Sequence, residues 1–317
     1  MRAVVCREWG TPEDLSVEEM PEPAMIDGGV RLAVEAAGVN FADTLMVSGE
    51  YQVRPPFPFS PGLEVAGTVL ECAPGVTRVK PGDRAFGLVG FGGYAEQVVA
   101  PEADVFRVPD DMDPVSAAAF PVVYGTSHIG LKEKLRLQPG EVLLVTGAAG
   151  GVGLTAVELG KKMGGTVIAA DYGADHLIDY RTEDIRERVK QLTDGRGADA
   201  VYDPVGGSAF DAALRACTQR GRILVVGFAS GTIPQVPANI LLVKNISLIG
   251  YFWGAHRKLD PDLIQRSFDE LLQWYADGAL RPHVSHTFDL ADAAKAMGAL
   301  KSRTSTGKVI LTTATRH

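Results

Sequence analysis

The clearest chemical pattern in the chain is a run of small residues between two apolar segments. Residues 142–145 are apolar and typical of a strand, and the residues after Gly153 show the apolar spacing of a helix. Between them the chain reads Gly147-Ala-Ala-Gly150-Gly151-Val152-Gly153. Glycines in such a loop let the backbone approach a pyrophosphate, and the N–H groups at the helix start bind the anion. The pattern therefore predicts a dinucleotide-binding site.

The segments around this loop indicate two domains of different kinds. Over residues 116–282, strand-like and helix-like runs alternate, which is typical of βαβ units and a parallel sheet. Residues 1–115 instead contain short β-like runs separated by glycine and proline, which favours a compact, mostly β unit. The tail, residues 283–317, contains an apolar run that we expect to return to this first unit as a strand.

Composition limits the function classes. The 317 residues are 46% hydrophobic and 22% charged, as in ordinary soluble proteins. A net charge of −8 disfavours nucleic acid and anionic membranes as partners. Cys6, Cys72 and Cys217 are too widely spaced for a disulfide framework or a CxxC metal site. The first residues lack the apolar core of a signal peptide, and no apolar run is long enough to span a bilayer, so we expect a cytoplasmic protein.

Stretches in consistent order along nearly the whole chain resemble one family, the quinone oxidoreductase branch of the medium-chain dehydrogenase/reductase superfamily. They are AGVNFADTLMVSGEY, PFSPGLEVAGTV, VKPGDRAFGL, GGYAEQVV, TGAAGGVGLTAVELGK, YDPVGG and GRILVVGFASG. The resemblance implies a GroES-like, mostly β catalytic domain (1–115 completed by 283–317) and a Rossmann domain with a doubly wound parallel sheet (116–282). It also implies NADPH, a homodimer joined through the Rossmann sheets, and hydride transfer to quinones or α,β-unsaturated carbonyls.

The zinc alcohol dehydrogenases of the same superfamily differ from this chain at their metal ligands. They carry a cysteine ligand where this chain has Asn40. They carry a histidine ligand where this chain has Leu63, directly before Glu64. A catalytic zinc needs about three protein ligands, and one candidate remains here. His283 and His286 form a close pair in the sequence but lack a third ligand. We therefore expect no metal.

By position, the resemblance implies two catalytic residues. Asn40 would lie near the nicotinamide ribose or the substrate carbonyl, and Tyr51 would line the substrate cleft as a hydrogen-bond donor. Each has a structural alternative, because Asn40 followed by Asp43 also fits a helix N-cap, and Tyr51 also fits packing under a proline-rich loop. Many relatives carry a tyrosine where this chain has Leu45, so a family-wide tyrosine acid does not transfer to it.

The resemblance also implies a set of cofactor contacts from several parts of the chain. They are Thr126, Gly150, Gly151, Val152, Gly153, Tyr180, Phe228, Phe252, Trp253, Arg303 and Lys308. Structural alternatives stay open for those outside the glycine loop: a helix-start hydroxyl for Thr126, packed aromatic rings at strand ends, and a solvated basic pair for Arg303 and Lys308.

The segment that would select the cofactor is unusually short. Asp171 directly follows a strand-like run and has the position of an acid that binds a ribose 2′-hydroxyl, which would favour NAD. However, only residues 171–175 precede the next apolar run, fewer than the dozen or so that a parallel crossover needs. We expect about a dozen family residues to be missing between Ala170 and Asp171, either left out of the sequence or truly deleted. NADPH is thus implied by resemblance, and the residues present do not discriminate against NADH.

These observations predict a zinc-free reductase that works by orientation, with Asn40, Tyr51 and the cofactor ribose donating hydrogen bonds to the acceptor oxygen. Two alternatives stay open. An enoyl-thioester (enoyl-CoA or enoyl-ACP) reductase shares the fold and the hydride chemistry, but no basic cluster flanks residues 49–59 to hold its substrate. A non-catalytic NADPH-binding protein of structural or regulatory type is the other.

Overall fold

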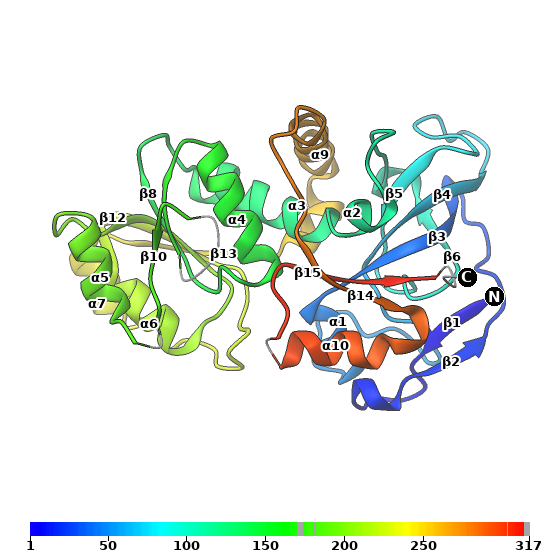
Figure 1. Cartoon of the computed structure of the whole chain (residues 1–317), viewed down its shortest axis with the longest axis horizontal. Helices are drawn as coiled ribbons and strands as arrows, with labels where there is room; N and C mark the ends of the chain where they lie inside the picture. Colours follow the sequence, from blue (N-terminus) through cyan, green and yellow to red (C-terminus); the bar gives the residue numbers. More distant parts are fainter. Residues whose placement is uncertain (170–173, 181, 303, 314–317) are drawn as a thin grey trace. The chain divides into compact units, whose positions relative to one another are not determined.

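The chain divides into two compact units. In the computed structural model, unit 1 comprises Met1–Val122 and Phe268–His317, and unit 2 comprises Val123–Ser267 (Figure 1). The structure describes residues 1–313 apart from 170–173, 181 and 303. Each unit has its own sheet and its own hydrophobic core.

The centre of unit 2 is a six-stranded parallel sheet with the order β10-β9-β8-β11-β12-β13. The chain adds β9 and β10 on one side of β8, and then β11 to β13 on the other side, which is the doubly wound order of dinucleotide-binding folds. The parallel α/β sheet predicted from the sequence is therefore confirmed. The strands are β8 (Val142–Val145), β9 (Thr166–Ala169), β10 (His176–Leu177), β11 (Ala198–Asp203), β12 (Cys217–Val225) and β13 (Ser247–Gly250).

Helices connect most of these parallel strands. α4 follows β8, α5 follows β10, α6 follows β11 and α7 follows β12, and all four residues of β8 are buried between them. None of the helices in the described part of the chain is long and apolar enough to cross a membrane. The helices with residues in unit 2 are α3 (Pro121–Ile129), η3 (Gly130–Leu135), α4 (Gly151–Lys162), α5 (Ile185–Leu192), α6 (Gly207–Ala216), α7 (Ala238–Lys244), η4 (Trp253–Ala255), α8 (His256–Leu259) and α9 (Pro261–Ala276).

The connection between β9 and β10 is much shorter than the others. Ile168 pairs with His176 and Ala169 pairs with Leu177, so residues 170–175 form the whole link. Parallel neighbours usually need about a dozen residues or more between them. The short link suffices because β10 has only two residues, and these pair with the C-terminal end of β9. Ala170 and Asp171, between which a segment is expected to be missing, lie outside the described residues.

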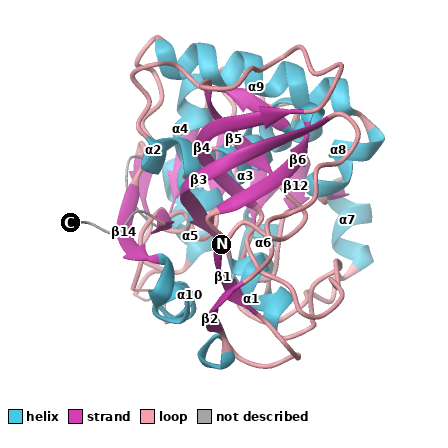
Figure 2. Cartoon of the chain, turned by 90° about the vertical axis from the view of Figure 1, so that its right-hand side faces the viewer, coloured by secondary structure: helices cyan, strands magenta, loops and turns pink. Residues whose placement is uncertain are grey.

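Unit 1 is built on a seven-stranded sheet. Its strands follow the order β14-β15-β3-β4-β5-β7, with β6 paired to β3, and a separate pair of strands, β1 and β2, completes the unit. Figure 2 shows β3, β4 and β5 side by side in the middle of this sheet. The strands are β1 (Arg2–Val5), β2 (Ser16–Glu19), β3 (Gly29–Val39), β4 (Glu64–Cys72), β5 (Arg84–Leu88), β6 (Gln97–Pro101), β7 (Val105–Arg107), β14 (Val284–Asp289) and β15 (Lys308–Thr312). Besides parts of α3 and α9, its helices are η1 (Pro12–Asp14), α1 (Phe41–Val47), η2 (Glu102–Asp104), α2 (Pro114–Ala118), η5 (Leu290–Asp292) and α10 (Ala293–Lys301).

The C-terminal strand completes the sheet of unit 1. β15 pairs antiparallel with β3, with Val309 opposite Val39 and Ile310 opposite Gly38. The apolar tail therefore pairs with a strand of the first unit. Continued by one residue, this register brings Lys308, the first residue of β15, level with Asn40, which follows β3.

Candidate active site

The predicted phosphate loop has the local geometry that anion binding requires. It leaves β8 at Val145, and α4 begins at Gly151 with Gly150 as its N-cap residue. Gly147 has a φ of +59°, which favours glycine. A Cβ on Gly153 would lie 2.2 Å from the carbonyl oxygen of Gly147, so a side chain has no room there. The first-turn N–H groups of α4 lack intrahelical acceptors and carry the positive end of the helix dipole, so this loop fits a pyrophosphate.

A buried hydroxyl cluster holds α4 in place beneath this loop. The Ser127 hydroxyl lies 2.8 Å from the carbonyl oxygen of Val152, 2.8 Å from the Thr155 hydroxyl and 3.0 Å from the Tyr202 hydroxyl. Burial raises the pKa of Tyr202, so its hydroxyl stays neutral. The cluster joins α3, α4 and β11. Sequence reasoning missed it, although Tyr202 opens the YDPVGG stretch.

Asp203 ties together the loops that follow the two central strands. It is the last residue of β11 and is fully buried. Its carboxylate accepts hydrogen bonds from the Thr146 hydroxyl, from the Gly206 N–H at 3.1 Å and from the Val205 N–H at 3.3 Å. Burial raises the pKa of Asp203, while these donors lower it. The strand order reverses between β8 and β11, which is where doubly wound sheets bind ligands.

Most of the other predicted cofactor residues of unit 2 follow the C-terminal ends of parallel strands. Phe228 follows β12 and lies close to the position that a Cβ on Gly206 would occupy, at 3.2 Å. Phe252 follows β13 and is 46% exposed, whereas the adjacent Trp253 is buried. Tyr180, after β10, is 54% exposed.

Thr126 has a different environment. It is buried within α3, and its carbonyl oxygen accepts a hydrogen bond from the Tyr251 hydroxyl at 3.1 Å. It therefore lies inside a helix that packs on the sheet, and not at a helix start, so the helix-start alternative is wrong.

In unit 1, Asn40 lies in a buried polar cluster. It is the N-cap residue of α1, and its backbone N–H donates to the carboxylate of Asp43 at 2.7 Å. Its side chain does not cap the helix. Instead, Nδ2 donates to Oε1 of Glu64 at 2.8 Å, and Oδ1 accepts from Nζ of Lys308 at 2.8 Å. The amide is thus held at both ends.

Lys308 is the cation of this cluster. Its Nζ also donates to Oε1 of Glu64 at 2.7 Å and to the carbonyl oxygen of Val39 at 3.1 Å, so all three N–H groups have acceptors. The other oxygen of Glu64 accepts from the Val122 N–H at 2.7 Å. Lys308 is 4% exposed and Glu64 is 0% exposed. Lys308 is therefore not part of a solvated pair, and Arg303 lies outside the described residues.

Asp43 completes the cluster from the side of α1. One carboxylate oxygen accepts from the Asn40 N–H and from the Tyr94 hydroxyl, the latter at 2.8 Å. The other oxygen, Oδ1, is buried and has no hydrogen-bond partner within the described part of the chain. Burial raises the pKa of Asp43 to about 7, although the Asn40 N–H, the Tyr94 hydroxyl and Lys308 each lower it. Sequence reasoning used Asp43 only as a helix-start signal.

Tyr51 and the histidine pair make contacts other than those with the members of this cluster. Tyr51 is half-buried and packs against the hydrophobic core of unit 1. His283 Nε2 lies 3.0 Å from the Thr306 hydroxyl, and His286 Nδ1 lies 2.9 Å from the Ser285 hydroxyl. The two histidines thus have separate hydroxyl partners, which fits a structural role.

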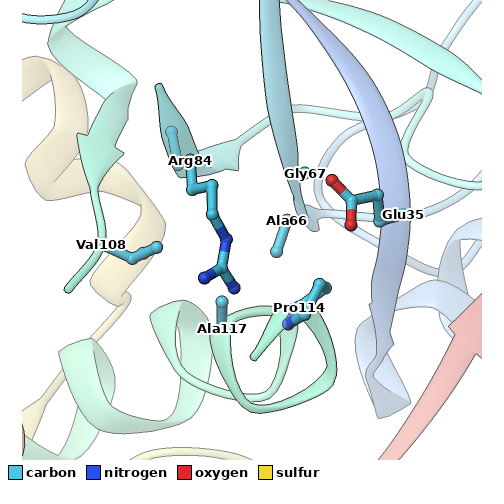
Figure 3. Close-up of a pocket in the computed structure, with 8 residues that line it drawn as sticks. Glu35, Ala66, Gly67, Arg84, Val108, Pro114 and Ala117 are labelled. Atoms are coloured by element: carbon cyan, nitrogen blue, oxygen red, sulfur yellow. The ribbon is translucent and has the colours of Figure 1, made fainter. Parts of the chain in front are cut away.

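A shallow hollow between the sheet of unit 1 and α2 is filled by a side chain (Figure 3). Arg84 reaches across it and donates to the carbonyl oxygens of Asp110, at 2.8 Å, and Met112. The hollow leaves no space for a water molecule, so it does not serve a substrate. Its lining consists of Glu35, Ala66, Gly67, Arg84, Ala85, Val108, Pro114 and Ala117.

Comparisons with known proteins agree with this architecture. Residues 26–110 match the alcohol dehydrogenase GroES-like domain, and residues 172–311 match the family described as zinc-binding dehydrogenase. A quinone oxidoreductase-like protein 2 homolog from Nematostella vectensis is 43% identical over 326 residues, which covers 98% of this chain and 89% of the relative. That alignment is longer than this chain, so the relative has residues that this chain lacks.

Solved structures extend the similarity to the whole fold. A mycobacterial protein in complex with NADPH is 33% identical with a TM-score of 0.91, covering 98% of this chain and 99% of that one. Quinone oxidoreductase from Escherichia coli, complexed with NADPH, is 28% identical with a TM-score of 0.90 and coverage of 98% and 100%.

The GroES-like and Rossmann-type domains define the protein as a two-domain oxidoreductase. The chain belongs to the quinone oxidoreductase branch of the medium-chain dehydrogenase/reductase superfamily, which confirms the resemblance found in the sequence.

The description of the matched family implies zinc, but the residues of unit 1 do not fit a catalytic zinc. Asn40 offers an amide where the zinc enzymes have a thiolate, and its oxygen already faces the Lys308 ammonium at 2.8 Å. The same ammonium lies 2.7 Å from Glu64 and would repel a divalent cation. Within the described ranges, no group of three or more His, Cys, Asp or Glu side chains could hold a metal ion. Three such ligands are about what a catalytic zinc requires.

Proposed function

We propose that the chain is an NADPH-dependent reductase that transfers hydride to quinones or α,β-unsaturated carbonyls and works without zinc. The observation that carries the proposal is the glycine loop between β8 and α4, where the carbonyl oxygen of Gly147 leaves no room for a side chain on Gly153. The NADPH bound to the Escherichia coli quinone oxidoreductase supports the choice of cofactor, and the name of that protein supports the choice of acceptor.

In this proposal the residues of unit 2 hold the cofactor along one edge of the sheet. The pyrophosphate lies against Gly150, Gly151, Val152 and Gly153, at the positive end of the α4 dipole. The exposed rings of Phe228 and Phe252, together with the buried Thr126 and Trp253, border the nicotinamide. Tyr180 borders the adenosine phosphate, and Arg303 is the proposed contribution of the C-terminal tail. Lys308, expected from the resemblance to contact the cofactor, is left out of this proposal because its three N–H groups already have acceptors in unit 1.

In the proposed reaction the protein orients the cofactor and the acceptor and supplies hydrogen-bond donors to the acceptor oxygen. When bound, the reduced nicotinamide supplies a hydride from its C4 atom. Arrival of the hydride leaves negative charge on the acceptor oxygen, which pre-placed donors stabilise. The Asn40 amide and the Tyr51 hydroxyl are the proposed donors, and the final proton comes from water. Because both ends of the Asn40 amide are already bonded, it needs no reorganisation when the charge develops.

An acceptor panel tests this function. Initial rates with NADPH would be compared for simple quinones, short enones and enoyl-CoA thioesters. We expect kcat/KM to be highest with quinones or short enones, and to fall in Asn40→Ala and Tyr51→Phe. A clear preference for enoyl-CoA would identify an enoyl-thioester reductase instead, and NADPH binding without turnover on any acceptor would identify a non-catalytic binding protein. Unchanged kcat/KM in both variants would contradict the proposed donors.

We also infer that two copies join through the Rossmann sheets. β13 is the last strand on its side, and Leu242 and Val243, in the helix α7 that leads into it, are 77% and 67% exposed. Such exposed apolar residues beside a sheet edge fit a subunit interface. Light scattering should give the mass of a dimer for the wild type and of a monomer for Leu242→Asp/Val243→Asp. Leu177→Asp, at the opposite edge, is the matched control and should stay dimeric.

A further inference from the structure

We propose that Lys308 and Glu64 are positioning residues that fix the direction of the Asn40 amide and polarise it, so that its remaining N–H meets the oxygen of the hydride acceptor. This inference rests on the proposed reductase function. It goes beyond that function because it assigns a task to two buried charges, which act through the Asn40 amide and not on the substrate.

The amide can adopt one orientation. An ammonium has only donors, so the group facing Lys308 Nζ at 2.8 Å must be the amide oxygen. An ionised carboxylate has only acceptors, so the group facing Glu64 Oε1 at 2.8 Å must be the NH2 group. A flipped amide would set NH2 against NH3⁺ and oxygen against a carboxylate. The two opposite charges therefore fix the orientation of the amide, which a pair of neutral neighbours would not fix.

One donor remains after these bonds are counted. Nδ2 of Asn40 carries two hydrogens, and Glu64 accepts one of them. Among the described residues, the second hydrogen has no acceptor in the hydrogen bonds of this cluster. The positive charge on the oxygen side draws electron density from the NH2 group, which strengthens that hydrogen as a donor. Burial of Lys308 and Glu64 keeps water from screening the effect.

The backbone is shaped around this ion pair. A Cβ on Gly38 would lie 2.3 Å from Oε1 of Glu64 and 2.6 Å from the carbonyl oxygen of Ala118. Glycine at this position therefore makes room for the carboxylate against β3. Lys308 comes into place through the pairing of β15 with β3. Both charges are thus fixed by the sheet and not by a mobile loop.

Stability alone gives a weak reason for this arrangement. Buried ion pairs often contribute little net stability, and well-packed apolar residues in their place can be as stable or more stable. An ion pair that orients a catalytic donor instead contributes to the rate of the reaction. Removal of both charges should therefore lower kcat/KM strongly and change the thermal stability little.

The test is a mutant cycle between Asn40 and the ion pair. Lys308→Met/Glu64→Gln removes both charges together and leaves neither one unpaired, so it should fold even if Lys308→Met alone does not. Combined with Asn40→Ala, it gives four proteins. Each would be assayed for NADPH affinity, thermal stability, and kcat/KM with one quinone and one less electrophilic enone.

We expect Asn40→Ala and the charge-removed variant each to lower kcat/KM roughly 100-fold, the size found for loss of one oxyanion donor. The triple variant should be no slower than either parent, because both changes remove the same donor. NADPH affinity should stay unchanged, and the loss should be larger with the enone, whose oxygen needs more stabilisation. A role confined to folding would lower the rate with both acceptors equally.

Multiplicative losses in the triple variant, or equal losses with both acceptors, would overturn the positioning role. A wild-type protein that reduces no acceptor would instead contradict the proposed function, and the positioning role with it. The two failures are therefore distinguished by the wild-type rate alone.

Discussion

Gly153 approaches the carbonyl of Gly147 so closely that a Cβ would lie 2.2 Å from the oxygen and 2.7 Å from the carbon. Both are backbone atoms, which move only if the loop moves. Gly150, in the same loop, differs, because the nearest atom to its Cβ would be 3.5 Å away. The two glycines thus have separate roles. Gly153 allows the helix to approach the backbone of the loop, and Gly150 leaves the surface of the loop free for a ligand.

This difference predicts that two alanine substitutions both weaken NADPH binding but differ in their effect on the melting temperature. Gly153→Ala should lower the melting temperature and weaken NADPH binding together, because the loop must shift. Gly150→Ala should leave the melting temperature near the wild-type value and weaken only NADPH binding, because its methyl group occupies the surface offered to the pyrophosphate. Differential scanning fluorimetry and titration calorimetry measure both. A stable Gly153→Ala protein with normal affinity would contradict this account of the loop.

Asp43 should make the protein less stable as the pH rises. Its folded pKa of about 7 lies above the ordinary value of 3.8 because burial disfavours the charged form. Between these pH values the folded state keeps the proton that the unfolded state releases, so the free energy of unfolding falls, with a slope of up to about 1.4 kcal/mol per pH unit. Tyr94, Lys308 and Glu64 are the titratable groups that face it.

Asp43→Asn is the control for that dependence, since an amide does not titrate. Urea unfolding at pH values from 4 to 8 should show a shallower decline in the variant than in the wild type between about pH 4 and 7. Parallel curves for the two proteins would show that Asp43 is ionised in the folded state and would contradict the raised pKa.

Tyr202→Phe should lower the free energy of unfolding while the packing of the ring stays intact. The substitution deletes the hydroxyl that bonds to Ser127 at 3.0 Å and keeps the buried ring. A typical buried hydrogen bond contributes about 1 kcal/mol, and urea titration should show a loss of that size. Tyr180→Phe is the exposed counterpart and should leave unfolding unchanged. Equal stabilities of Tyr202→Phe and wild type would mean that the hydroxyl cluster does not anchor α4.

Chelators should leave the activity unchanged. The Lys308 ammonium lies between Asn40 and Glu64, so the proposed reaction uses a fixed protein cation and no metal. Dialysis against a strong zinc chelator, followed by metal analysis and rate measurement, checks this. Loss of activity that added zinc restores would contradict the zinc-free reaction.

The parts of this fold that the sequence predicted are those with local signals. Val142 to Gly153 read as strand, loop and helix because apolar spacing and glycines mark each piece within a few residues. The Asn40–Glu64–Lys308 cluster has no local signal, because it depends on how β15 pairs with β3 from the other end of the chain. The difference between exposed Phe252 and buried Trp253 is likewise set by packing and not by residue type.

Transfer of deuterium from the cofactor to the product tests directly whether the protein moves a hydride between them. NADPH deuterated at both C4 hydrogens would be incubated with the protein and a short enone, and the product analysed by mass spectrometry and NMR. We expect one deuterium on the β-carbon of the reduced product, in an amount equal to the NADPH consumed. A reduced product without deuterium, or oxidation of NADPH with no reduced product, would contradict direct hydride transfer.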